Sequence, residues 1–94
     1  METIVRKRLR CFGWVQGVGF RWRARHAADL AGATGWVRNE DDGSVTMEIQ
    51  GDEAVIRKVI RVLENDRYIQ ITGMDSRTLP PDPQERDFRT DYGW

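Results

Sequence analysis

Alternating apolar and charged residues predict a first strand from Ile4 to Phe12. A period of two is typical of a strand that buries one face. The apolar face is formed by Val5, Leu9 and Cys11, and the charged face by Arg6, Arg8 and Arg10. We therefore expect the apolar face to pack against helices and the three arginines to lie on the opposite side of a sheet.

Two segments have the 3.6-residue period of amphipathic helices. The first runs from Phe20 to Ala31, and Gly32 follows it as a C-cap. The second is predicted to begin after Asp52, a favourable N-cap residue, with an acid in its first turn. Its apolar stripe comprises Val55, Ile56, Val59, Ile60 and Leu63.

Three further apolar segments complete the predicted sheet. Trp36–Asn39 and Val45–Gln50 flank an Asp-Gly turn and so predict a hairpin. A fourth strand begins around Ile69 and Ile71, and the last one alternates Phe88, Thr90 and Tyr92. The prolines between these strands, which mark a stiff loop, are Pro80, Pro81 and Pro83.

This order of elements reads β-α-β-β-α-β, within a single predicted domain covering residues 1–94. It predicts an α+β fold, a ferredoxin-like two-layer sandwich with two helices on one face of a mainly antiparallel sheet. The other face is then partly open. If the first and third strands are neighbours, the three arginines lie beside Thr46 and Glu48 and form cross-strand ion pairs.

Composition narrows the class of protein. The 39 % hydrophobic and 32 % charged content of the 94 residues is ordinary for a soluble globular chain. Lys+Arg and Asp+Glu both number 15, so a strongly electrostatic partner such as duplex DNA is not indicated. The lone Cys11 excludes an internal disulfide and is interpreted as a core residue. Without a signal-peptide core or a membrane-spanning run, the cytoplasm is the expected compartment.

The segment from Val15 to Arg21 carries the clearest chemistry. It predicts a glycine-rich loop that leads from a strand into a helix, with an arginine in the first helical turn. A guanidinium offers a planar fork of donors that matches phosphate oxygens. Because the Gly-Lys-Ser/Thr ending of a nucleotide-binding loop is missing, the pattern indicates a phosphate group held without a nucleotide or magnesium.

Three motifs resemble those of the acylphosphatase family, and the resemblance is strongest from about Leu9 to Gly51. They are Gly13-Trp14-Val15-Gln16-Gly17-Val18-Gly19-Phe20-Arg21, Gly35-Trp36-Val37-Arg38-Asn39 and Asp42-Gly43. The resemblance implies the same ferredoxin-like fold and a small enzyme that hydrolyses acyl phosphates to a carboxylate and inorganic phosphate. It also places the family's catalytic asparagine at Asn39.

The resemblance gives each site residue an expected role. Arg21 and the main-chain N–H groups of the loop hold the phosphoryl group, and Asn39 holds the attacking water. The loop residues are Gln16, Gly17, Val18, Gly19 and Phe20. A carboxylate leaves with little or no protonation, which removes the main demand for a general acid, and the water's proton can pass to the phosphate. No metal is expected, because the sequence has no His/Cys cluster and Asp41-Asp42 lacks the rest of a calcium-loop pattern, and no cofactor is expected. His26 is interpreted as a solvated residue.

Alternatives from other classes remain at this stage. The chain could be a non-catalytic phosphate- or RNA-binding module, although its third strand offers no aromatic residue for base stacking. It could also correspond to the acylphosphatase-like domain of larger carbamoyl-transferring proteins, although its end at residue 94 favours a stand-alone enzyme. A monomer is expected at this size. Trp14 and Trp22 either line the mouth of the site or pack elsewhere. Trp14 replaces a frequent family arginine, which favours apolar acyl groups.

Overall fold

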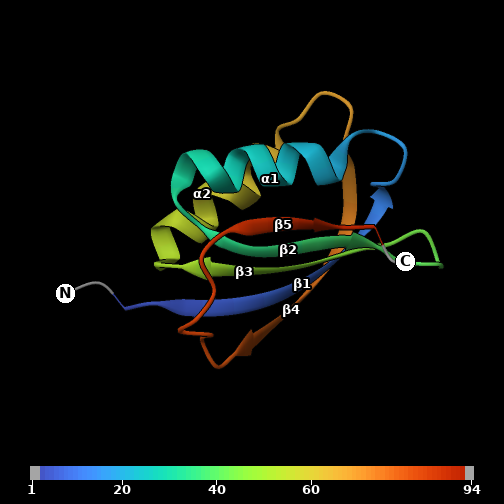
Figure 1. Ribbon diagram of the computed structural model, residues 1–94. Helices are drawn as coiled ribbons and strands as arrows, with labels where there is room; N and C mark the ends of the chain where they lie inside the picture. Colours follow the sequence, from blue (N-terminus) through green and yellow to red (C-terminus); the bar gives the residue numbers. More distant parts are fainter. Residues whose placement is uncertain (1–2, 93–94) are drawn as a thin grey trace.

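The computed structural model describes residues 3–92, so both ends of the predicted domain lie outside the described residues. Figure 1 shows its strands and helices in order along the chain. They are β1 (Val5–Trp14), α1 (Phe20–Ala31), β2 (Thr34–Asn39), β3 (Val45–Gly51), α2 (Glu53–Glu64), β4 (Gln70–Leu79) and β5 (Phe88–Asp91). The strands form one sheet in the order β4-β1-β3-β2-β5.

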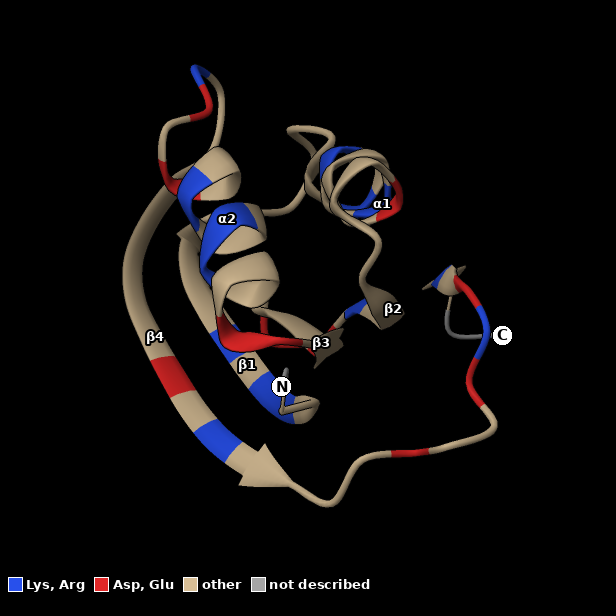
Figure 2. Ribbon diagram, turned by 90° about the vertical axis from the view of Figure 1, so that its left-hand side faces the viewer, with Lys and Arg blue, Asp and Glu red and all other residues tan. Residues whose placement is uncertain are grey.

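The topology confirms the predicted ferredoxin-like α+β fold. Neighbouring strands pair antiparallel, except that β5 runs parallel to β2. Both helices lie on one side of the sheet, as Figure 2 shows. The core between the layers includes Leu9, Cys11, Phe20, Ala24, Met47, Ile49, Ile56, Val59 and Leu63. Burying a large apolar side chain of this kind contributes about 1.5–3 kcal/mol.

Local signals set the helix ends where the sequence predicts them. Gly32 has a φ of +81° and donates its N–H to the Ala28 carbonyl, which closes α1. Asp52 accepts a hydrogen bond from the Val55 N–H at 2.8 Å and caps α2. At the start of α1, Gly19 is the N-cap and provides no side chain to cap the first turn.

The ends of the strands differ from the prediction because strand pairing, rather than local sequence, decides them. β1 continues through Trp14 past an irregularity between Phe12 and Gly13, so Trp14 belongs to the strand and not to the loop. β4 continues to Leu79, which pairs with Arg6 of β1. β5 ends at Asp91, and Tyr92 lies beyond the strand.

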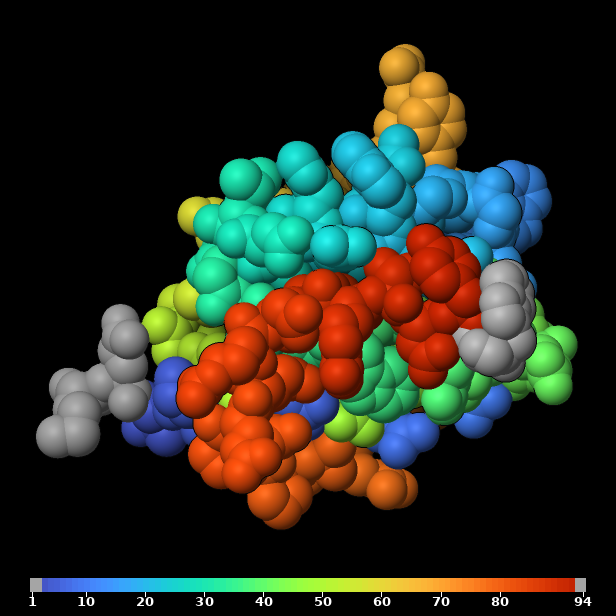
Figure 3. Space-filling model, in the orientation of Figure 1, coloured from blue at the N-terminus to red at the C-terminus, as the bar shows by residue number. Residues whose placement is uncertain are grey.

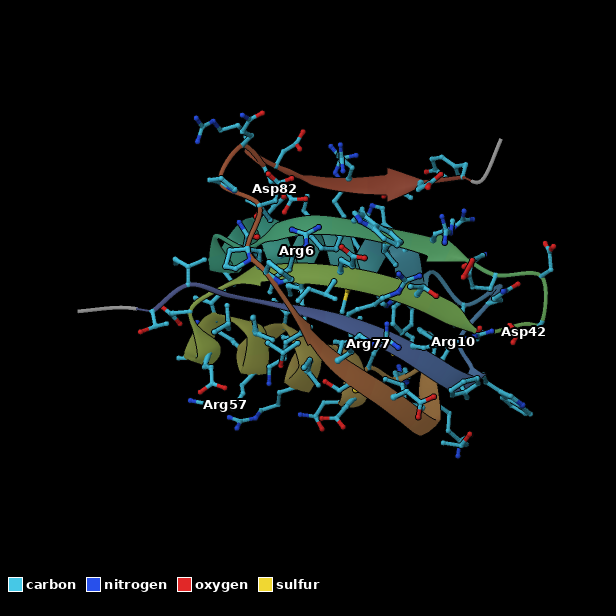
Figure 4. All side chains as sticks on the ribbon, turned by 90° about the horizontal axis from the view of Figure 1, so that it is seen from below. Arg6, Arg10, Asp42, Arg57, Arg77 and Asp82 are labelled. Atoms are coloured by element: carbon cyan, nitrogen blue, oxygen red, sulfur yellow. The ribbon has the colours of Figure 1, made fainter. Side chains whose placement is uncertain are left out.

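The sheet face opposite the helices is only partly open. Residues 80–87, which we call the strap, lead from β4 at one edge of the sheet to β5 at the other edge. Gln50 of β3 binds this segment through two hydrogen bonds with the main chain of Asp82, at 2.9 and 2.7 Å. In Figure 4, Asp82 and Arg6 lie close together where the strap crosses the sheet.

Arg6 is therefore buried, whereas the sequence pattern placed it with Arg8 and Arg10 on a partly open face and did not distinguish the three. It is 6 % exposed and donates to Glu48, Gln50 and Glu85 at distances between 2.8 and 3.2 Å. Burial alone would lower the pKa of Arg6, but the hydrogen bonds to Glu85 and Glu48 outweigh it, and the pKa is raised. The predicted cross-strand pairing is confirmed for Arg8 too, whose Nη1 lies 3.6 Å from Glu48.

Candidate active site

The glycine loop, residues Gln16–Gly19, connects the end of β1 to the start of α1. The apolar residues on either side of it, Val15 and Phe20, are buried and fix its two ends in the core. Gly17 and Gly19 have φ values of +74° and +79°, a region that side chains other than glycine rarely adopt. The loop can therefore form a tight curve directly at the N-terminus of the helix.

The main-chain N–H groups of this segment have no hydrogen-bond partner within residues 3–92, from Gln16 to Trp22. Hydrogen bonding resumes at Arg23, whose N–H donates to the Gly19 carbonyl at 3.0 Å. A helix start normally has its free N–H groups capped by a side chain or hydrated. The run of free donors at the positive end of α1 suits an anion.

Arg21 projects from the first turn of α1 into an open cleft and is half-buried. Its guanidinium lies over the ring of Tyr92, 4.6 Å from the centroid. In the described part of the chain it forms no ion pair and no hydrogen bond. The ring thus supports one side of the guanidinium while its N–H groups stay available to a ligand.

Asn39 reaches the same cleft from the end of β2, where it pairs with Val45 of β3. Its side-chain amide makes no hydrogen bond with the described residues. The residues lining the cleft are Arg10, Gln16, Arg21, Arg38, Asn39, Glu40, Asp41, Asp42 and Tyr92. The structure therefore brings Gln16, Arg21 and Asn39 together, whereas the other predicted loop residues, 17–20, follow Gln16 without lining the cleft.

Most of the other charged groups in the cleft neutralise one another. Arg38 pairs with Glu40 at 2.9 Å, and Arg10 pairs with Asp42 at 2.5 Å. The hydrogen bond from Arg38 lowers the pKa of Glu40. Hydrogen bonds from Ser44, assisted by Arg10, lower the pKa of Asp42. Arg10 and Asp42 face each other at the end of the sheet in Figure 4.

Sequence reasoning missed three contributions to the cleft. The Gln16 side chain donates to the carbonyls of Glu40 and Ser44, at 2.7 and 2.9 Å, and so connects the glycine loop to the β2–β3 turn. Tyr92 supports Arg21, and Arg38 holds Glu40. For the side-chain contact of Gln16, the only indication in the sequence was a polar residue between an apolar valine and the glycines. No local pattern indicated the contacts of Tyr92 and Arg38.

The two tryptophans considered for the mouth of the site lie elsewhere. Trp14 ends β1 with 74 % of its surface exposed, and it does not line the cleft. Trp22 stacks on His26 with ring centroids 5.0 Å apart and lines a separate groove between α1 and α2. His26 is exposed, as predicted. Within residues 3–92, no three His, Cys, Asp or Glu side chains gather in a way that could hold a metal ion.

The fold and the cleft together describe a ferredoxin-like domain whose first helix begins at a glycine loop with free amides. A family model described as acylphosphatase matches residues 7–90. The chain belongs to the acylphosphatase family.

Relatives and solved structures agree with this assignment. A protein of Clostridium perfringens named acylphosphatase is 39 % identical over 88 residues, covering 93 % of this chain and 99 % of that protein. One of Rhizobium etli with the same name is 41 % identical over 83 residues, covering 87 % and 88 %. The crystal structure of acylphosphatase from Bacillus subtilis has a TM-score of 0.86 and 28 % identity, covering 94 % of this chain and 99 % of that one.

A larger protein contains the same fold. Full-length HypF, solved in a phosphate- and nucleotide-bound form, matches with a TM-score of 0.85 and 26 % identity, covering 97 % of this chain but 12 % of HypF. Family and relatives make the present chain an enzyme of the acylphosphatase type, with acyl phosphates as substrates and phosphate as product. In the described part of the chain, no helix is long and apolar enough to cross a membrane.

Proposed function

We propose that Arg21 and the main-chain N–H groups of Gln16–Phe20 hold the phosphoryl group while water attacks phosphorus. The new bond forms between the water oxygen and phosphorus, and the bond from phosphorus to the carboxyl oxygen breaks. The carboxylate leaves with the electron pair, and the water's proton passes to a phosphoryl oxygen. Such a reaction demands positioning and charge stabilisation more than proton transfer by a side chain.

One observation carries this proposal: consecutive unpartnered amides from Gln16 to Trp22 adjoin an arginine that has no acidic partner among the described residues. Because no protein group accepts from these amides among the described residues, they are available to solvent or to a ligand. An oxyanion of three oxygens would satisfy several of these donors at once. Tyr92 supports the same reading, because its ring holds the guanidinium in place without occupying its donors.

Asn39 positions the attacking water. Its amide offers both an oxygen acceptor and an N–H₂ donor, and neither is used within the described residues. Both the end of β2 and the first turn of α1 are parts of rigid elements, so the distance between Asn39 and Arg21 is set by the fold. This rigidity favours attack in line with the bond that breaks.

The test is hydrolysis of benzoyl phosphate followed by ultraviolet absorbance, with and without a chelator. We expect turnover that the chelator does not change, and losses of about 10²–10³-fold in Arg21→Gln and Asn39→Ala, the scale of one charge-stabilising donor. Arg25→Gln is the matched control, because Arg25 lies on the same helix with 59 % of its side chain exposed. Near wild-type activity in Arg21→Gln would refute the assignment, and a large loss in His26→Ala would refute proton transfer to the phosphate.

The alternative of an RNA-binding module is weaker. The sequence argument considered only the third strand, but Phe12 of β1 and Trp36 of β2 also lie on the sheet face opposite the helices. However, Arg10 lies over the first ring at 5.6 Å and Arg38 over the second at 5.0 Å, where bases would have to stack. We expect no shift of short RNA in a gel at physiological salt.

A further inference from the structure

The glycine loop is held from two sides, and one of these contacts comes from outside the cleft. On the cleft side, Gln16 binds the β2–β3 turn. On the other side, Arg23 donates from Nη1 to the Val18 carbonyl at 3.3 Å. Arg23 is not among the residues that line the cleft. Its contact with the loop therefore needs an explanation other than contact with substrate.

Arg23 is itself fixed by the connection between α2 and β4. Its Nε donates to the Asp66 carboxylate, and the other oxygen of that carboxylate accepts the N–H of Tyr68 at 2.8 Å and of Ile69 at 3.3 Å. The Tyr68 ring lies 5.5 Å from the guanidinium. The paired side chains are 28 % and 16 % exposed, less than those of a typical surface ion pair.

This contact joins two segments that are distant in the sequence. In Figures 1 and 3 the orange α2–β4 connection stands beside the blue start of α1. The hydrogen bond between Arg23 and Asp66 spans 43 residues of the chain. Through Arg23, the α2–β4 connection is thus linked to the glycine loop.

The geometry of the peptide bond turns this contact into a constraint on the site. The Val18 carbonyl and the Gly19 N–H belong to one planar trans peptide, so they point in opposite directions. A bond that holds the carbonyl toward Arg23 therefore directs the Gly19 N–H away from Arg23. Glycine at position 19 would otherwise let this peptide rotate. A Cβ there would approach Arg23 Nη1 to 2.5 Å, so any other residue at this position would displace the end of the Arg23 side chain from the loop.

We propose that Arg23 and Asp66 are positioning residues that keep the Gly19 amide directed at the phosphoryl group. This inference rests on the proposed function, because it assigns a purpose to one of the loop amides. Neither residue touches substrate. They act through the Val18–Gly19 peptide, which remains in place while phosphate binds and leaves.

The experiment compares Arg23→Met, Arg23→Lys and Asp66→Asn with Arg25→Met, whose partner Asp29 forms an exposed pair on the same helix. Inorganic phosphate is titrated while the Gly17 and Gly19 amide signals are followed by nuclear magnetic resonance, and hydrolysis of benzoyl phosphate is measured in parallel. In Arg23→Met we expect the Gly19 signal to lose its phosphate-induced shift while Gly17 keeps it. Phosphate should bind about tenfold more weakly, the scale of one hydrogen bond.

The other variants separate geometry from charge. Arg23→Lys keeps the charge but cannot contact both partners, so we expect it to resemble Arg23→Met. Asp66→Asn keeps an oxygen acceptor and should lie between wild type and Arg23→Met. An unchanged Gly19 shift and phosphate affinity in a folded Arg23→Met protein would overturn the inference. Failure of the wild type to bind phosphate through the loop would instead refute the proposed function.

Discussion

Arg6 and Arg21 both lie at the second position of a regular element, in β1 and in α1, but only the charge of Arg6 is compensated by acidic side chains among the described residues. Arg6 lies near the start of β1, and Arg21 follows the end of the same strand. Arg6 is surrounded by Glu48, Gln50 and Glu85, and the strap covers it. Arg21 rests on the Tyr92 ring and has no acidic partner among residues 3–92.

The difference separates a structural arginine from an arginine whose donors remain available to a ligand. A buried guanidinium must have its charge compensated within the protein, and Arg6 fulfils this requirement with two carboxylates. A half-buried guanidinium without a carboxylate keeps its donors for a ligand and contributes little to folding. The comparison predicts that substituting Arg6 lowers the stability of the protein, whereas substituting Arg21 lowers its activity.

The largest effect is expected for Arg6→Met. Removing Arg6 from this buried pair leaves the Glu85 side chain, only 4 % exposed, with the exposed Arg89 at 3.9 Å as its remaining cation, which should lower the free energy of unfolding by about 3–5 kcal/mol. Urea unfolding measures this value. Arg8→Met is the control, because Arg8 is 44 % exposed and should lose less than about 1 kcal/mol. Equal losses of unfolding free energy in both variants would contradict the view that burial under the strap makes Arg6 more important for stability than Arg8.

Arg21→Gln should have the reverse profile. We expect its transition-state stabilisation to fall by about 2.7–4 kcal/mol, seen as a drop in kcat for benzoyl phosphate. Its free energy of unfolding should stay within about 0.5 kcal/mol of the wild type, since no described partner loses a bond. A destabilisation as large as that of Arg6→Met would contradict the distinction between the two arginines.

Phosphate should stabilise the folded protein through Arg21 but not through the arginines of β1. At a concentration of one hundred times Kd, a ligand that binds only the folded state adds about 2.7 kcal/mol. Thermal unfolding in phosphate, against chloride of equal ionic strength, measures the gain. We expect Arg8→Met to keep it and Arg21→Gln to lose most of it. An equal gain in Arg21→Gln would place the anion elsewhere.

The smallest effect concerns Glu40 at the edge of the cleft. The pKa of its carboxyl is lowered by the hydrogen bond from Arg38, so the folded state binds the proton less readily than the unfolded chain. The resulting stabilisation is present above the unfolded pKa of a glutamate and is lost as the pH falls through the lowered value. Glu40→Gln should flatten this acid limb of the stability curve, by less than about 1 kcal/mol. An unchanged limb would contradict the assignment.

Local signals allowed the helix boundaries to be predicted, and the motifs singled out two residues that the structure brings to one cleft. Glycines set both ends of α1, and Asp52 sets the start of α2, so these boundaries could be found without tertiary information. The motifs placed Arg21 and Asn39 at the ends of rigid elements, and the structure brings both to one cleft. Their roles in catalysis stay predictions.

Long-range contacts account for what the sequence did not reveal. Arg6 and Glu85 are 79 positions apart, and no local pattern indicates that a proline-containing connection folds back over the first strand. The length of β4 depends on pairing with β1, and the contact between Arg23 and Asp66 depends on how the two helices pack. An alternating arginine pattern looked the same for buried Arg6 and exposed Arg8.

The strap also affects how the C-terminal edge of the sheet behaves. A strand of four residues such as β5 would be prone to fraying at an edge, yet its upstream side is anchored through Glu85 to Arg6. Peeling β5 away from β2 would carry Tyr92 off the guanidinium that it supports. The ion pair between Glu85 and Arg6 therefore limits how often Tyr92 separates from Arg21. If so, amide exchange along Phe88–Asp91 is slower in the wild type than in Arg6→Met.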